Sequence, residues 1–414
     1  MSNPLMVGID PHRKTNTVCV MDRSGQEVGP RFTVDNNRPG TTDFVHQIAR
    51  HLLDGDFDAL HIASEATGWY WWHFFQTLEQ DPVLNQWPLT LYPFNPRLTA
   101  NYKKTFVDLD HTDPIDAFVV ADRLRIGRDL PAPFHYDAVH FPLRMLTRYR
   151  YHVVHNLARE KAYCLAILYF KCSEYSRKDK QPFSDLFGAT SRAVLQAFAS
   201  LEEIAAMPFD ELVEFIDVQG KRRFPDPHAN ARTLLQAARD SYPLPEAMQA
   251  PVNLILALSL RQITFLEGQA MRLNTAIAQG MQAIPHTLDT IPGIGPVFSA
   301  GIISEIAGLQ RFDYNQAKVA KFAGLKWRQT QSAEFQAEET RLTRTGNRYL
   351  RYYFCEAANA VRLQDPEYGA YYRKKFLEVR KHQHKRAIVL TARKLVRLVV
   401  RLLTTHQPYQ PRRC

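Results

Sequence analysis

Four acidic residues in the first third of the chain have the spacing of a metal-binding site. Asp10 ends one apolar run, Glu65 directly follows another, and Asp113 and Asp116 open a helical segment with Pro114 in its first turn. The i, i+3 spacing puts the last two on one helix face, with Cβ atoms about 5–6 Å apart. Converging carboxylates repel unless cations neutralise them, and Mg²⁺ is the usual choice beside phosphate oxygens. One or two Mg²⁺ ions on these ligands would stabilise both the attacking and the leaving oxygen of a phosphodiester.

Taken singly, the same residues have ordinary structural roles. Asp113 is also typical of a helix cap, Asp10 of a turn and Glu65 of a solvated strand end. Their order, Asp, Glu and Asp-x-x-Asp, together with the elements between them, favours the metal site.

The elements that must position these carboxylates follow from the hydrophobic pattern. The pattern predicts three strands within 5–35, a helix at 42–53, a strand at 59–63, a helix at 69–78, a strand at 89–92, a turn at 93–96 and a helix from about 112. This order is typical of an α/β domain of the ribonuclease-H or RuvC type, in which helices cover a mixed sheet. We assign residues 1–135 to this catalytic domain.

The rest of the chain is predicted to be all-α. Proline-free runs at 143–173 and 252–284 predict two long helices that pair as an antiparallel coiled coil, through which a dimer could form. Prolines break the intervening 174–250 into an irregular helical insert. We therefore expect a coiled-coil region at 136–285 and a mostly helical C-terminal domain at 286–414.

Positive charge is concentrated at the C-terminal end. The chain has 52 Lys+Arg against 42 Asp+Glu, but residues 311–414 alone have 23 against 8. Such a segment is typical of a nucleic-acid surface, although a basic face can also serve solubility alone. The candidate phosphate ligands are Arg341, Arg344, Arg348 and Arg351, at helical spacing, and Lys374, Lys375, Lys381, Lys385 and Arg386 in a basic helical region.

A Pro-Gly-x-Gly motif opens the C-terminal domain. Gly293 and Gly295 lie between two predicted helices, as in a helix-hairpin-helix, where bare backbone N–H groups approach a phosphate. A glycine-rich turn without a ligand is the alternative.

Other features of the sequence exclude several classes of protein. The five cysteines are scattered without a C-x-x-C pair, which indicates reduced thiols rather than disulfides or structural zinc. No apolar stretch of about eighteen residues occurs, and the N-terminus has no signal-peptide pattern. We expect a soluble protein of the bacterial cytoplasm with no membrane partner.

Seven short motifs together resemble transposases of the insertion-sequence one-hundred-and-ten family. They are residues 7–12, 64–68, 95–96, 111–117, 291–296, 322–325 and 345–351. The resemblance covers about 250 residues at both ends of the chain and leaves 174–250 outside. It implies a RuvC-like Asp-Glu-Asp-Asp domain and a recombinase that moves its own element. It also implies DNA as substrate and a structured bridge RNA that specifies donor and target.

The resemblance further implies a catalytic serine a few residues beyond an Ala-Gly-Leu motif. The matching position is Ser332, although Ala333 stands where glycine is usual and Thr330 is the nearest alternative hydroxyl. Ser332 would form a transient 5′-phosphoserine link that the 3′-hydroxyl of another strand resolves, so that no ATP is needed. The active form would be a dimer or a dimer of dimers, in which the carboxylates and Ser332 come from one subunit or from two.

Three other functions remain open at this point. The chain could be a metal-dependent nuclease or junction resolvase that uses water, with Ser332 uninvolved. It could be an ATP-binding protein of the sugar-kinase and actin fold, although no glycine follows Asp10 before Gly25 to wrap a phosphate. It could also be a nucleic-acid-binding protein without catalytic activity.

Overall fold

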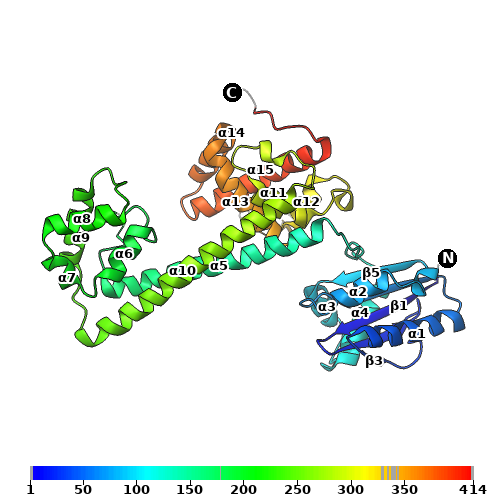
Figure 1. Ribbon diagram of the computed structural model, residues 1–414. Coiled ribbons are helices and arrows are strands. Elements are labelled where there is room, and N and C mark those ends of the chain that lie inside the picture. The colour runs from blue at the N-terminus through cyan, green and yellow to red at the C-terminus, as the bar shows by residue number, and fades with distance from the viewer. Residues whose placement is uncertain are drawn as a thin grey trace. The chain divides into compact units, whose positions relative to one another are not determined.

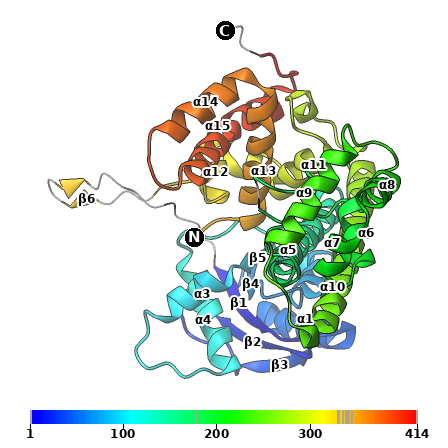
Figure 2. The ribbon, with the colours of Figure 1, turned by 90° about the vertical axis from the view of Figure 1, so that its left-hand side faces the viewer.

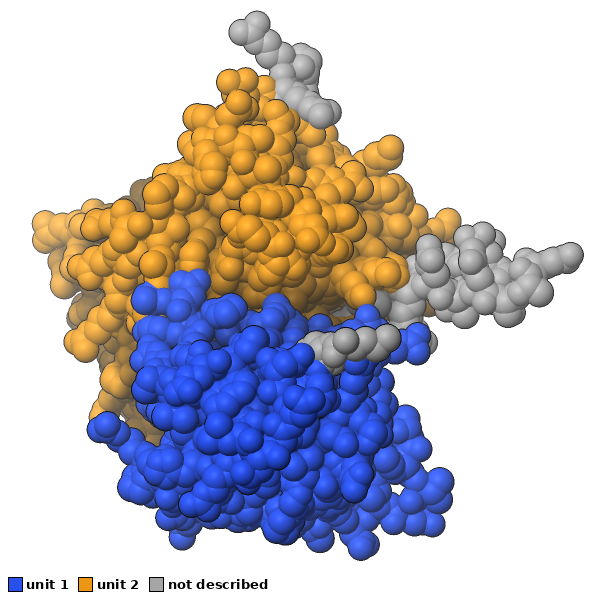
Figure 3. All heavy atoms as spheres, turned by 90° about the vertical axis from the view of Figure 1, so that its right-hand side faces the viewer, with its two compact units in different colours: residues 1–138 blue, residues 139–414 orange. Residues whose placement is uncertain are grey.

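The computed structural model describes residues 3–177, 179–327 and 345–411, together with residue 342 and the backbone of 331, 332, 335 and 336. The chain forms two compact units, Met1–Ala138 and Val139–Cys414. Figure 1 colours the chain by residue number, and Figure 3 shows the first unit in blue and the second in orange. Within the described part of the chain, no helix combines the length and the apolarity needed to cross a membrane.

The first unit is built on a five-stranded mixed sheet, labelled in Figure 2. Its strands are β1 (Pro4–Pro11), β2 (Thr15–Met21), β3 (Phe32–Asp35), β4 (Ala59–Glu65) and β5 (Leu89–Phe94). They lie in the order β3-β2-β1-β4-β5, with β1, β4 and β5 parallel and β2 antiparallel to both of its neighbours. The helices are α1 (Arg38–Asp54), α2 (Trp72–Glu79), α3 (Pro96–Lys103) and α4 (Asp113–Ile126), with a short 3₁₀ helix at Leu84–Gln86.

Alternation along β1 separates the two faces of this sheet. Leu5, Val7 and Ile9 join a core that includes buried side chains of α1 and α2, whereas Met6 joins a second core with α4. Because side chains alternate between faces, Gly8 and Asp10 belong to the α4 face.

Gly8 permits an unusually close contact between β1 and α4. A Cβ atom at Gly8 would overlap the backbone of Ala117 and Ala121. The backbone of α4 therefore lies directly against β1 at Gly8, two residues before Asp10.

Most of the expected elements of this unit are present, with one correction. The turn predicted at 93–96 is wrong, because β5 continues to Phe94 and α3 begins at Pro96. Asn95 caps α3, since its side chain accepts a hydrogen bond from the Arg97 N–H at 3.0 Å, and proline suits a first helical turn.

Two long helices, α5 (His140–Lys171) and α10 (Glu246–Met281), form the axis of the second unit (Figure 1). Side-chain bonds join Arg150 to Asn274 at 2.6 Å and Lys171 to Asn253 at 2.7 Å. Residue numbers rise along α5 as they fall along α10, so the predicted antiparallel pairing is confirmed. The helix α10 starts earlier than the predicted 252 and includes Pro251 near its beginning.

The segment between the long helices forms separate helical pieces, as predicted, and they pack with side chains of α5 and α10 around one core. Its helices are α6 (Ala189–Ala197), α7 (Leu201–Ala206), α8 (Phe209–Gln219) and α9 (Pro227–Asp240). Leu212, Ile216 and Leu234 are fully buried in that core. Pro208, Pro227 and Pro245 stand at the starts of α8, α9 and α10, where a missing N–H costs little.

The C-terminal part of this unit is helical around a second core. Its elements are a 3₁₀ helix at Leu288–Thr290, α11 (Pro296–Ile306), a 3₁₀ helix at Gln310–Phe312, α12 (Gln316–Phe322), β6 (Gln331–Ser332), β7 (Phe335–Gln336), α13 (Arg348–Gln364), α14 (Pro366–Leu377) and α15 (Gln383–Thr405). Buried Glu305 of α11 accepts two hydrogen bonds from Arg148 of α5, at 2.7 and 2.9 Å. Asn347, which caps α13, donates a third at 2.6 Å. This network ties α13 to the long helix.

Replacement of Gly8 by alanine is expected to weaken the first unit. The new methyl group must displace the backbone of α4, and overpacking of this kind costs about 1–3 kcal/mol. Urea denaturation followed by tryptophan fluorescence measures this cost, because four of the five tryptophans lie within 69–87. Gly268→Ala on α10, where a Cβ meets nothing within 4 Å, is the matched control and should be neutral or stabilising by circular dichroism. An unchanged urea midpoint for Gly8→Ala would contradict the role given to this contact.

Candidate active site

Asp10 and Glu65 lie at the same end and on the same face of the sheet. The strands β1 and β4 are parallel and pair Ile9 with Ser64, so the next residue of each strand is one of the two acids. The Cβ atoms of neighbouring residues in a paired register are about 5 Å apart. The sheet therefore brings together two carboxylates that are distant in the sequence.

The helix α4 brings the other two carboxylates to this edge. Asp113 and Asp116 occupy its first turn, and α4 lies against β1 through the Gly8 contact. A helix N-terminus has unpaired N–H groups and a partial positive charge, which favour acidic side chains there.

The carboxylates of Asp10 and Asp113 form a compact donor cluster with the imidazole of His12. One ligand atom from each of these residues lies within 4.8 Å of the others. His12 Nδ1 is 3.7 Å from a carboxylate oxygen of Asp10. Sequence reasoning missed His12, although its position two residues after Asp10 along an extended chain indicates the same face.

Burial and neighbouring charges shift the pKa of the Asp10 carboxyl. Burial raises the pKa of the Asp10 carboxyl from 3.8 to about 6; His12 opposes the rise, and Asp116, Asp113 and Glu65 reinforce it. The other three predicted acids therefore lie close enough to act on the Asp10 carboxyl. Oxygen ligands with a shared excess of negative charge suit a hard divalent cation.

Side chains of α3 bind two of the four carboxylates. Thr99 donates its hydroxyl hydrogen to one oxygen of Glu65, and Thr67 donates to the other at 3.2 Å. One turn later, Lys103 pairs with Asp116 at 2.6 Å and also contacts His111 Nδ1 at 3.0 Å. Sequence reasoning missed Thr99 and Lys103, since no local pattern indicates that α3 packs here.

Ser332 lies in a short antiparallel strand pair of the second unit, labelled β6 in Figure 2. The backbone of Ser332 pairs with Phe335, and Trp327 bridges Leu342 further down. The alternative hydroxyl, Thr330, lies outside the described residues.

Two glycines hold the base of this hairpin together. A Cβ atom at Gly346 would overlap the backbone of Phe322 and Gly324, and Gly324 has a left-handed φ of +70°. The Asn347 N–H donates to the Phe322 carbonyl at 2.6 Å. The motifs at 322–325 and 345–351 thus contact each other at the two ends of the segment that contains Ser332.

The predicted phosphate ligands have different surroundings. Arg341 and Arg344 lie outside the described residues, and α13 begins at Arg348, which is exposed. Arg351 contacts the Ala323 carbonyl at 3.5 Å. The basic region is divided between α14 and α15. Exposed residues there are Lys374, Lys381, Lys385 and Arg386, while Lys375 and Arg386 both pair with Glu378.

Gly293 and Gly295 precede α11, as expected, but their settings differ. Gly293 has a φ of +91°, and a Cβ there would lie 2.9 Å from the backbone of Ala360 in α13. This contact requires glycine without any ligand. Gly295 is open, with nothing within 4 Å of an added Cβ. Phosphate binding at both residues stays a prediction.

Comparison with known proteins identifies the family. A family model described as a transposase matches residues 7–171, and one described as the transposase IS116/IS110/IS902 family matches residues 285–373. The insertion element IS900 uncharacterized 42 kDa protein of Mycobacterium paratuberculosis is 22% identical over 313 residues, which is 72% of this chain and 73% of that protein. The chain belongs to the IS110 family of transposases.

The raised pKa of Asp10 predicts a pH-dependent stability in the absence of metal. The folded state binds the proton more tightly than the unfolded state, so this carboxyl stabilises the fold least above its folded pKa. Between pH 4 and about 6.5, the free energy of unfolding of EDTA-treated protein should fall by about 2 kcal/mol more than that of Asp10→Asn. Urea titrations at each pH measure this difference. Parallel pH profiles for the two proteins would count against the proposed crowding of charge.

Lys103 is expected to compete with a metal ion for Asp116. In Lys103→Met, the Mg²⁺ concentration that gives half-maximal thermal stabilisation should fall roughly two- to fivefold, because a partly exposed ion pair is worth up to about 1 kcal/mol. Differential scanning fluorimetry over a Mg²⁺ series measures this midpoint, and Lys104→Met, at the exposed neighbouring residue, should leave it unchanged. A midpoint that stays constant or rises in Lys103→Met rejects the competition.

Proposed function

We propose that this chain is the recombinase of an insertion element, which cuts and rejoins DNA strands at the site of Asp10, Glu65, Asp113 and Asp116. The observation that supports it best is the convergence of Glu65, Asp113 and Asp116 on the Asp10 carboxyl in a chain of the IS110 family. The strand order β3-β2-β1-β4-β5 with α4 against β1 also supports a RuvC-like assignment of the first unit.

The four carboxylates would hold one or two Mg²⁺ ions, which supply charge stabilisation to the attacking and leaving oxygens of the phosphodiester. The chain's own residues prepare this site. Thr99 and Thr67 fix both oxygens of Glu65, and α4 holds two ligands on a rigid first turn. Lys103 neutralises Asp116 until a ligand replaces it, and can then face a phosphate.

Ser332 is the proposed nucleophile. Its hydroxyl oxygen attacks the phosphorus and loses its proton to a base, for which a carboxylate of the cluster or His12 is suited. The bond from phosphorus to the 3′ oxygen breaks, that oxygen takes up a proton, and a 5′-phosphoserine remains. The 3′-hydroxyl of another strand reverses these events, so that the number of phosphodiester bonds is conserved.

The proposed partners follow from the same family. A structured bridge RNA would select donor and target DNA, and a dimer or a dimer of dimers would combine the carboxylates with Ser332. The basic excess after residue 311 provides charge for both polyanions. The contact between Gly324 and Gly346 would fix the two ends of the segment that contains Ser332.

Paired substitutions separate the roles of serine and carboxylate. Ser332→Ala should abolish the covalent protein–DNA adduct and strand exchange, at least a thousandfold, while Mg²⁺ still raises the melting temperature. Asp113→Asn should lose both effects, because a ligand is missing. The assay uses purified protein with its co-purifying RNA and a plasmid with the element's ends, and a denaturing gel detects the adduct.

The neighbouring Asp110→Asn, at an exposed position before α4, is the matched control and should behave as the wild type. Strand cleavage that persists in Ser332→Ala would replace the recombinase with a nuclease that uses water. Full activity in Asp113→Asn would reject the carboxylate site itself.

A further inference from the structure

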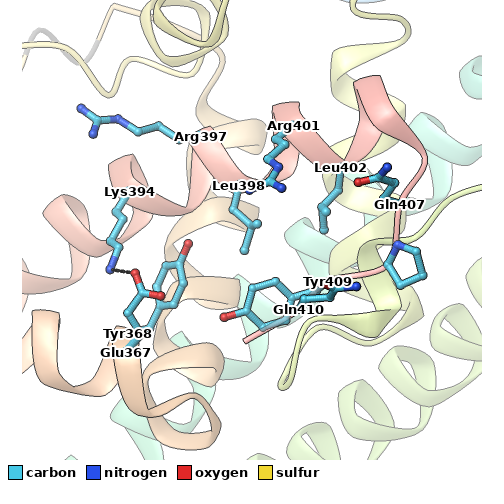
Figure 4. A pocket seen from close by; sticks show the side chains of 11 residues that line it. Glu367, Tyr368, Lys394, Arg397, Leu398, Arg401, Leu402, Gln407, Tyr409 and Gln410 are labelled. Atoms are coloured by element: carbon cyan, nitrogen blue, oxygen red, sulfur yellow. Dashed lines mark ion pairs between the residues drawn. The ribbon is translucent and has the colours of Figure 1, made fainter. Parts of the chain in front are cut away.

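The second unit contains a cavity whose walls include neither Ser332 nor any of the four acids. It has a volume of about 370 Å³ and is walled by α14, α15 and the chain that follows α15 (Figure 4). The volume is at the small end of the range for ligand pockets, about 300–1,000 Å³. No part of the proposed recombination chemistry uses it.

One wall of the cavity has positive charge that no acid neutralises. Arg397 and Arg401 stand one turn apart on α15 and are both exposed. Among the residues that the structure describes, no carboxylate pairs with either of them. The third cation, Lys394, is already paired with Glu367 at 2.7 Å. An anionic occupant would therefore not have to displace a described carboxylate from Arg401.

Another part of the cavity wall is aromatic and apolar. The Tyr409 hydroxyl donates to buried Asp365 at 2.6 Å, and its backbone N–H donates to Thr290 at 2.8 Å. These two bonds hold the chain after α15 in place as a wall of the cavity. Leu398 and Leu402 add apolar surface beside the Tyr409 ring (Figure 4).

An anion alone would use only half of this cavity. Guanidinium groups bind phosphate oxygens well, whereas the tyrosine ring and the leucines need a flat, largely apolar partner. A nucleobase with its phosphate combines both properties, and bases outside a helix stack readily on aromatic side chains.

Figure 4 shows the Arg401 side chain directed toward the Tyr409 side of the cavity and the Arg397 side chain directed away from it. We propose that this cavity binds a single unstacked nucleotide, with a phosphate on Arg401 and its base beside Tyr409. The inference extends the proposed function, because the nucleotide would belong to a strand that the enzyme handles. Its position gives the enzyme an anchor for single-stranded nucleic acid outside the reacting centre.

Direct binding of a minimal fragment tests the proposal. The probe is uridine 3′,5′-bisphosphate, which has one base between two phosphates, and isothermal titration calorimetry on the full chain measures its Kd. We expect it to bind at least tenfold more tightly than inorganic phosphate. The double variant Arg397→Gln/Arg401→Gln should lose at least tenfold of this affinity, and Arg397→Lys/Arg401→Lys should retain part of it.

The matched control is Arg261→Gln/Arg272→Gln, two exposed arginines of α10, which should bind the probe as the wild type does. Equal affinity for the probe and for phosphate, or an equal loss in the control, overturns the proposal. The deoxy analogue then distinguishes the source: weaker binding indicates RNA, and equal binding admits DNA. This assay needs neither Mg²⁺ nor Ser332, so its failure and the failure of the recombination chemistry are separate results.

Discussion

Repulsion among carboxylates is the constraint around which the first unit is arranged. Asp10 and Glu65 are adjacent because two parallel strands end together, and Asp113 and Asp116 join them because α4 rests on Gly8. Such crowding is unfavourable in a folded protein without a compensating charge. The unit limits this cost with a helix N-terminus and with Lys103, while threonine hydroxyls bind Glu65. Each of these contacts also fixes the direction of a ligand, so the same interactions stabilise the fold and shape the site.

In the second unit, a buried ion pair likewise both stabilises the fold and fixes the position of functional candidates. Glu305 is almost fully buried, and it is bonded by Arg148 from α5 and by Asn347 at the cap of α13. A buried charge is tolerated only when it is paired and hydrogen-bonded. Because Asn347 follows Gly346 directly, this pair also anchors one end of the hairpin that contains Ser332. The close contact between Gly324 and Gly346 holds the two ends of this segment together, which explains the glycine in each of these motifs.

Local patterns in the sequence predicted the sheet, the long helices and the family well. Alternation in β1 and the position of Asp10 at its end are readable from a few residues, and so is the first turn of α4. Lys103, Thr99 and the Gly293 contact were not predictable, because each depends on which helix packs nearby. The proline-rich insert was predicted as separate helical pieces, and α6 to α9 lie there. The pattern did not show that Pro208, Pro227 and Pro245 stand at helix starts, or that apolar residues between them, such as Leu212 and Leu234, bury a core, because only tertiary packing reveals this.

Charge is distributed unevenly along the chain. Residues 1–310 have 29 Lys+Arg and 34 Asp+Glu, so the four acids of the candidate site lie in a part of the chain with a negative net charge, which does not attract a polyanion. A phosphodiester would approach such a cluster only when cations reverse its local charge. Residues 311–414, with 23 Lys+Arg and 8 Asp+Glu, can bind the same backbone without a metal. Binding and cleavage would therefore respond differently to salt and to chelators: salt weakens the first, and removal of the divalent ion stops the second while leaving the nucleic acid bound.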